Sequence, residues 1–211
     1  MTKNLTFEAF ESEWLIDILE NDPSSTEKGH RFSKKLVGQW FDFDSDSVSP
    51  DDIVFCDGAG DGGIDIAYLQ RGDDDEENQK EGDTWYLVQS KYGKALQGTN
   101  TLLQEAQKLI DTLDGKRTNL SSLTENLINR LKTFRTSSSN KDRVVLVFAT
   151  QRPLTDDEKR AVQDIKAMGK SRLGLNFDTE SISLENIYQR ILETTKASNT
   201  VKINITAHLV P

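Results

Sequence analysis

Two short motifs on either side of a very polar stretch most constrain how this chain can fold. Residues 61–65 read DGGID and open an apolar run, and a second apolar run over 85–91 ends in QSK. If the two runs form neighbouring strands, Asp65, Gln89 and Lys91 lie together at one end of that pair. An acid beside a lysine at such a place is suited to holding a divalent metal ion and orienting a water molecule for attack on a phosphodiester.

Length and composition exclude several classes of protein. A chain of 211 residues is long enough for one large domain with a sizeable core. It contains no run of about 18 apolar residues, so no transmembrane helix is expected, and its start lacks the apolar core of a secretory signal. One cysteine and two distant histidines argue against a zinc site and predict a reducing, cytoplasmic setting. Any bound metal is expected to be a hard cation with oxygen ligands.

The net charge of −9 is unusual for a protein that binds nucleic acid, because such proteins usually present a basic face. Part of the acidity is local, in five consecutive acidic residues at 73–77 within a predicted hairpin loop over 71–83. A metal site itself needs carboxylates, so the charge weakens a nucleic-acid interpretation without excluding it. It also leaves open that the DNA-binding surface belongs to another chain or to a segment outside this sequence.

The spacing of apolar residues predicts an α/β sandwich. Helices are expected over residues 6–20, 28–40 and 102–113, from Ser122 onward, over 155–168 and over 184–192. Strands are expected over 53–56, 64–69, 85–91, 144–149, 173–177 and 201–210. The strand over 144–149 is apolar throughout, as buried parallel strands are. Capping boxes are predicted for Ser122 with Glu125 and for Thr155 with Glu158.

The two motifs resemble those of the PD-(D/E)xK nuclease superfamily and, within it, the Mrr-like restriction endonuclease domain. That group shows an acid-Gly-Gly-Ile-Asp turn and Gln-x-Lys in place of Glu-x-Lys. Phe10 and Glu11 are similar to the Phe-Glu that opens such domains, with the Glu facing the site. Residues 147–150 and 154–158 resemble the strand-Thr-helix unit that follows their catalytic core. The long loop and its early position also resemble the start of larger abortive-phage-infection proteins.

The resemblance implies a fold for the whole chain. It implies one restriction-endonuclease-like domain over residues 1–211, with a nuclease core over about 7–170 and a C-terminal αβ extension over about 171–211. The expected fold class is α/β, a restriction-endonuclease-like three-layer core in which helices flank a mixed central sheet.

The resemblance also implies roles for four side chains. Asp65 would be the principal ligand of Mg²⁺ or Mn²⁺, and Gln89 would offer a neutral carbonyl oxygen where most relatives have a carboxylate. Glu11, which lies in the middle of the apolar face of the first helix, would supply the second acid. Lys91 would orient or help to deprotonate the attacking water and offset the charge on the phosphate.

Each role has a plainer alternative. Asp65 could bond a turn amide, Glu11 could pair with a neighbouring base, and Lys91 could be a surface lysine at a strand end. Asp61 is expected to cap the glycine turn, and Glu105 is expected on the solvated side of its helix.

The implied function is that of a metal-dependent DNA endonuclease that acts in defence against foreign or phage DNA. The alternative is a catalytically inactive nuclease-fold module that binds nucleic acid or a partner domain. The expected partner is DNA, and no association with a membrane is expected. A homodimer, and further domains if the chain is a piece of a longer protein, stay open.

Overall fold

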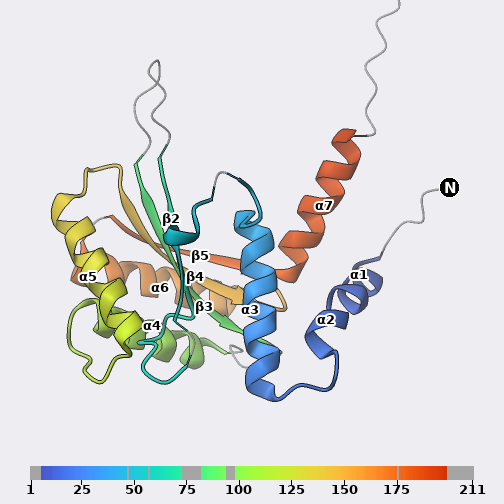
Figure 1. Ribbon diagram of the computed structural model, residues 1–211, viewed down its shortest axis with the longest axis horizontal. Helices are drawn as coiled ribbons and strands as arrows, with labels where there is room; N and C mark the ends of the chain where they lie inside the picture. The colour runs from blue at the N-terminus through green and yellow to red at the C-terminus, as the bar shows by residue number, and fades with distance from the viewer. Residues whose placement is uncertain are drawn as a thin grey trace, which may run out of the picture.

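The computed structural model describes residues 6–46, 48–56, 58–72, 82–93, 98–174 and 176–198. Within these residues a mixed five-stranded sheet has the order β1-β2-β3-β4-β5 (Figure 1). The strands are β1 Ile53–Phe55, β2 Ile66–Gln70, β3 Thr84–Lys91, β4 Arg143–Thr150 and β5 Phe177–Ser183. The first three strands are antiparallel, and β3, β4 and β5 run parallel to one another. The protein is therefore a mixed α/β fold, as expected.

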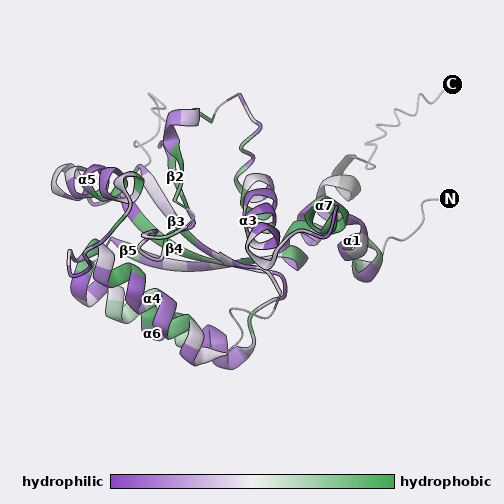
Figure 2. Cartoon of the chain, turned by 60° about the horizontal axis from the view of Figure 1, so that its bottom comes forward, coloured by the Kyte–Doolittle hydropathy of each residue, from purple (hydrophilic) through white to green (hydrophobic). Residues whose placement is uncertain are grey.

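Helices flank both faces of this sheet (Figures 1 and 2). One face is covered by α4 Thr99–Leu113, α5 Ser122–Ser137 and α6 Asp156–Leu173. The other is covered by α1 Phe7–Trp14, α2 Ile16–Leu19, α3 Ser25–Phe41 and α7 Leu184–Ser198. A short 3-10 helix, Pro50–Asp52, precedes β1. Below, the two faces are called the α4 face and the α3 face.

Side chains along the central strands alternate between the two faces. In β3, Trp85 and Leu87 belong to the core on the α4 face, whereas Val88 belongs to the core on the α3 face. All residues of β4 after Arg143 are buried, because both faces of this central parallel strand are covered. The expectation of a buried parallel strand here is confirmed.

Several predicted elements are confirmed and others need correction. The capping box of Thr155 and Glu158 is present, but the one predicted for Ser122 is wrong, since Ser121 caps α5 and accepts from the backbone of Thr124. The first predicted helix is divided at Leu15 into α1 and α2, and the second begins at Ser25.

The predicted strand over 173–177 is also wrong. Leu173 ends α6, Gly174 caps that helix at φ 111°, and the strand begins only at Phe177. Leu173, at the end of α6, and Phe177, at the start of β5, both contact the core on the α4 face. Their spacing in the sequence therefore resembles the alternating apolar residues of a strand. The acidic block at 73–77 and the predicted strand over 201–210 lie outside the described residues.

Among the residues that the structure describes, none of the helices combines the length and the apolar character needed to cross a membrane.

Glu158 ties three segments together near one end of the sheet. Its carboxylate is only 2% exposed and accepts hydrogen bonds from Arg152 at 2.8 and 3.0 Å and from the backbone of Thr155 at 2.8 Å. It also accepts from the backbone of Gly98, which caps α4, at 2.7 Å. The Arg152 guanidinium is the main cause that lowers the pKa of Glu158 to about 2, from an ordinary value of 4.5.

This geometry predicts an acid-sensitive contribution to stability. Because the folded pKa of Glu158 is depressed, the contribution is fully present above about pH 4.5 and is lost as the pH falls toward about 2. We expect Glu158→Gln to lower the free energy of unfolding by about 2–3 kcal/mol at pH 7, since Arg152 is partly exposed and water screens the pair. Urea unfolding at pH 7 and pH 3 should show the difference between wild type and variant shrinking at the lower pH. A difference that is independent of pH would contradict the assignment.

Candidate functional site

A glycine turn packed against α4 delivers the first predicted site residue. Asp61 Oδ1 accepts from the backbone of Gly63 at 2.7 Å and pairs with Lys108 Nζ at 2.9 Å, so Asp61 caps the turn as expected. Gly63 has φ 87°, and a Cβ there would lie 3.1 Å from the backbone nitrogen of Leu109. Only glycine allows this backbone conformation and this approach to α4, and the turn thereby places Asp65 at the start of β2.

Asp65 joins the two motifs directly. Its backbone N–H donates to Val88 at 2.9 Å, beside the last register pair of Ile66 with Val88. Its Oδ2 then accepts from the backbone of Ser90 at 2.6 Å and from Gln89 Nε2 at 3.3 Å. The carboxylate therefore continues the contact between β2 and β3 where the strand pairing ends. Asp65 thus bonds a backbone amide, as its plainer interpretation expected, and it also contacts Gln89; its role as a metal ligand stays a prediction.

The amide of Gln89 leaves one polar atom without a partner. Gln89 is 1% exposed, and its Oε1 is buried without a hydrogen bond to any residue that the structure describes. Such an atom is costly in a protein interior, so it points to a ligand or to a functional role. With the amide turned over, Oε1 would face Asp65 Oδ2, an arrangement that a cation between the two oxygens would stabilise.

Lys91 lies two residues beyond Gln89, so the two side chains project from the same face of β3. It is the last residue of the strand, in register with Thr150 of β4, and is half-buried. Within the described part of the chain its ammonium group forms no ion pair and no hydrogen bond. Lys91 is thus a cation at the strand end with no structural partner there.

Glu11 approaches the same end of the sheet from the other face. Its Oε1 accepts from Gln151 Nε2 at 2.9 Å, and Gln151 directly follows β4. The neighbours of Glu11 in α1, Phe10 and Trp14, belong to the core on the α3 face, whereas the alternation of β3 sends Gln89 to the α4 face. The described contacts therefore do not bring Glu11 together with the other predicted site residues.

Glu105 lies differently from the sequence expectation. It is half-buried in α4 rather than solvated, and its Oε2 is buried without a hydrogen-bond partner among the residues described above. Leu102 and Leu109, three residues before and four after it, are both fully buried. This spacing places Glu105 beside the apolar face of α4 and is the sequence signal that could have found it.

The chain was also compared with protein-family models, with curated proteins and with solved structures. No family model, curated protein or solved structure matches this chain.

The candidate metal donors are few. Within the described ranges no three Asp, Glu, His or Cys side chains come close enough to hold a metal ion together. A metal at this end of the sheet would therefore need Gln89 as well as carboxylates. Asp65 and Gln89 are oxygen donors of the kind that Mg²⁺ and Mn²⁺ accept, and the unpartnered Gln89 Oε1 fits that use.

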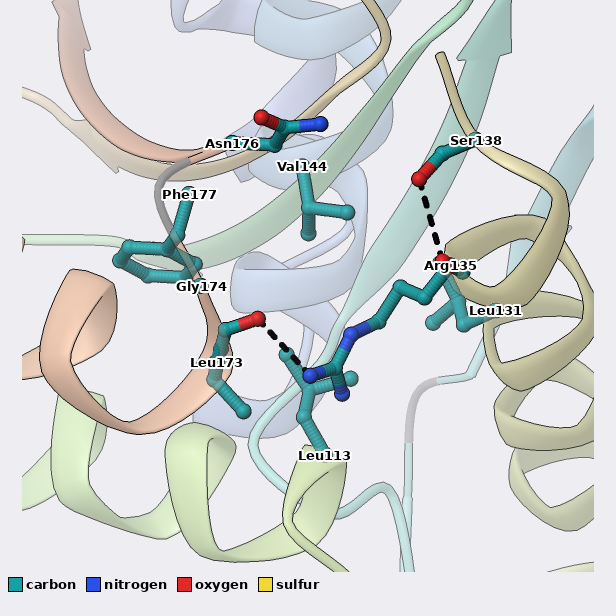
Figure 3. Close-up of a pocket in the computed structure, with 9 residues that line it drawn as sticks. All are labelled: Leu113, Leu131, Arg135, Ser138, Val144, Leu173, Gly174, Asn176 and Phe177. Carbon is teal, nitrogen blue, oxygen red and sulfur yellow. Dashed lines mark hydrogen bonds between the residues drawn. The ribbon is translucent and has the colours of Figure 1, made fainter. Parts of the chain in front are cut away.

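An apolar pocket of about 270 Å³ lies at the opposite end of the sheet (Figure 3). Val144 and Phe177, at the starts of β4 and β5, line it, and Arg135 crosses it to donate to the backbone of Leu173 at 2.8 Å. Its lining contains no carboxylate, so we do not place the candidate site there.

Proposed function

We propose that this chain is a metal-dependent DNA endonuclease of the PD-(D/E)xK type, in its Mrr-like Gln variant, acting against foreign or phage DNA. The observation that supports this most is the direct contact of Asp65 with Gln89, with Lys91 on the same strand face two residues on. The restriction-endonuclease-like fold and a cytoplasmic setting belong to the same proposal.

In this proposal Asp65 and Gln89 hold Mg²⁺ or Mn²⁺. A bound ion of this kind polarises phosphoryl oxygens and lowers the pKa of a bound water. Lys91, which has no partner in the described structure, donates a hydrogen bond to the attacking water or to a phosphate oxygen and offsets developing negative charge. Glu11 can join only by exchanging its bond with Gln151 for the metal or for a metal-bound water.

The alternative, a catalytically inactive module, is favoured by the net charge of −9. Basic side chains of α3 are also partly neutralised, since Arg31 pairs with Glu27 and Lys35 pairs with Asp17. DNA binding by this chain is therefore expected to depend strongly on the metal ion.

The two functions are separated by a cleavage assay. Supercoiled plasmid, single-stranded DNA and RNA are incubated with the protein in MgCl₂, in MnCl₂ and in EDTA. Nicked or linear DNA that forms only with a metal ion supports the endonuclease. Failure of the folded protein to cut any substrate in either metal would overturn it in favour of the inactive module.

A gain-of-function variant tests whether the metal lies at Gln89. Gln89→Glu places a second carboxylate against Asp65, whose Oδ2 is 3.3 Å from Gln89 Nε2. Without metal the like charges should repel and lower the midpoint of thermal unfolding by about 2–6 °C. With MnCl₂ the variant should gain more stability than wild type, because the added charge strengthens metal binding.

Gln151→Glu is the matched control for this experiment. It places the same like-charge pair on the α3 face, next to Glu11, at a nitrogen-to-oxygen distance of 2.9 Å. We expect it to lose stability in EDTA without an increased response to MnCl₂. An unchanged metal response in Gln89→Glu would contradict the proposed position of the ion.

A further inference from the structure

Of the four buried side-chain oxygen atoms that lack a hydrogen-bond partner in the described part of the chain, two belong to side chains of β3 and α4 that bear on the α4 face. One is Gln89 Oε1 on β3, and the other is Glu105 Oε2 on α4. A buried carboxylate oxygen that forms no hydrogen bond is expensive, and the cost is far greater for a charged group than for a neutral one. Glu105 has no ion-pair or hydrogen-bond partner among the described residues that would offset it.

Contacts at two points of α4 indicate where Glu105 lies relative to β3. Gly98 caps the start of the helix and donates to Glu158 of α6, which also binds Arg152 just beyond the end of β4. Its Leu109 abuts Gly63, which leads into Asp65 at the start of β2. Since β3 lies between β4 and β2, the intervening part of α4 crosses β3 near that same end.

Glu105 belongs to this crossing segment. It precedes Leu109 by four residues, which is about 6 Å along the helix axis. It also follows the fully buried Leu102 by three residues, so it lies beside the buried side of the helix. The side chains of Gln89 and Lys91 project from β3 on the face that α4 covers.

We propose that Glu105 supplies the second carboxylate of the metal site, in the place that the resemblance assigned to Glu11. This inference rests on the proposed function and deepens it. Asp65, Gln89 and Glu105 would together offer two carboxylates and one carbonyl, a set of hard oxygen donors. Glu105 restores the negative charge that a glutamine in the second motif removes. Glu11 keeps its bond to Gln151 on the other face.

The test measures metal binding rather than cleavage. Mn²⁺ is titrated into the full chain and its affinity is measured by calorimetry for wild type, Glu105→Gln and Glu11→Gln. Glu11→Gln is the matched control, because it changes the same residue type on a helix of the α3 face. We expect Glu105→Gln to weaken Mn²⁺ binding about 10- to 100-fold and Glu11→Gln to change it by less than about threefold.

Thermal unfolding in EDTA provides a second readout that a merely structural glutamate would not give. Removing a buried charge without a partner should raise the unfolding midpoint of Glu105→Gln, whereas loss of a structural contact would lower it. The rise in midpoint on adding MnCl₂ should at the same time become smaller than in wild type. A lower midpoint in EDTA with an unchanged response to MnCl₂ would overturn the proposal.

Asp65→Asn separates failure of this inference from failure of the proposed function. If Asp65→Asn loses Mn²⁺ binding and Glu105→Gln retains it, Glu105 is not a ligand although the site stands. If Glu11→Gln loses binding and Glu105→Gln does not, the second acid comes from the α3 face and the inference is wrong. If none of the three variants affects binding, the metal site itself is misplaced and both proposals fail.

Discussion

Replacing Lys91 by methionine is expected to reduce metal-dependent DNA cleavage by about 10²- to 10³-fold without unfolding the protein. The ammonium group forms no ion pair or hydrogen bond within the described residues, so its loss removes no structural contact there. Methionine keeps an unbranched apolar side chain on the half-buried strand end. Single-turnover cleavage rates should fall while the midpoint of thermal unfolding changes by no more than about 2 °C.

Lys108→Met is the matched control for that variant. Lys108 lies on α4 beside the same glycine turn, but it pairs with Asp61 at 2.9 Å. We expect its loss to lower stability and to leave most of the cleavage activity. If Lys91→Met instead loses stability and activity together, Lys91 is a structural residue and not a catalytic one.

The second large effect is expected at Asp65, where charge and backbone bonding can be separated. Asp65→Asn keeps an oxygen that can accept from the backbone of Ser90, but it removes the negative charge. We expect Mn²⁺ binding measured by calorimetry to be lost and cleavage to fall by about 10³-fold or more, because the principal ligand loses its charge. The free energy of unfolding in EDTA should change by only about 1 kcal/mol.

Asp65→Ala removes both roles at once. It leaves the backbone N–H of Ser90 without its acceptor, so it should cost about 2 kcal/mol more stability than the asparagine variant. Urea unfolding of the two variants in EDTA measures this difference. Retained metal-dependent cleavage in Asp65→Asn would show that Asp65 only closes the contact between β2 and β3.

Much of the fold follows from chemistry that is local in the chain. Gly63 requires a positive φ, and Thr155 with Glu158 caps α6 through bonds made within four residues. The apolar run of β4 requires helices on both faces of the sheet. Such features can be predicted from the sequence, because residues close together in the chain determine them. The meeting of Asp65 with Gln89 also follows once β2 and β3 are read as adjacent strands.

Which helix glutamate lies on the same face of the sheet as Gln89 is a matter that only tertiary structure decided. Glu11 and Glu105 both lie beside apolar residues of a helix, and helical spacing cannot tell which helix covers which face of the sheet. The packing of α4 against Gly63 places Glu105 on the face of Gln89, whereas α1 packs on the other face. That Gln89 Oε1 is left without a partner likewise depends on Asp65, 24 residues away, whose carboxylate accepts from the amide nitrogen. Contacts between residues so far apart depend on how whole elements pack, and no local pattern encodes them.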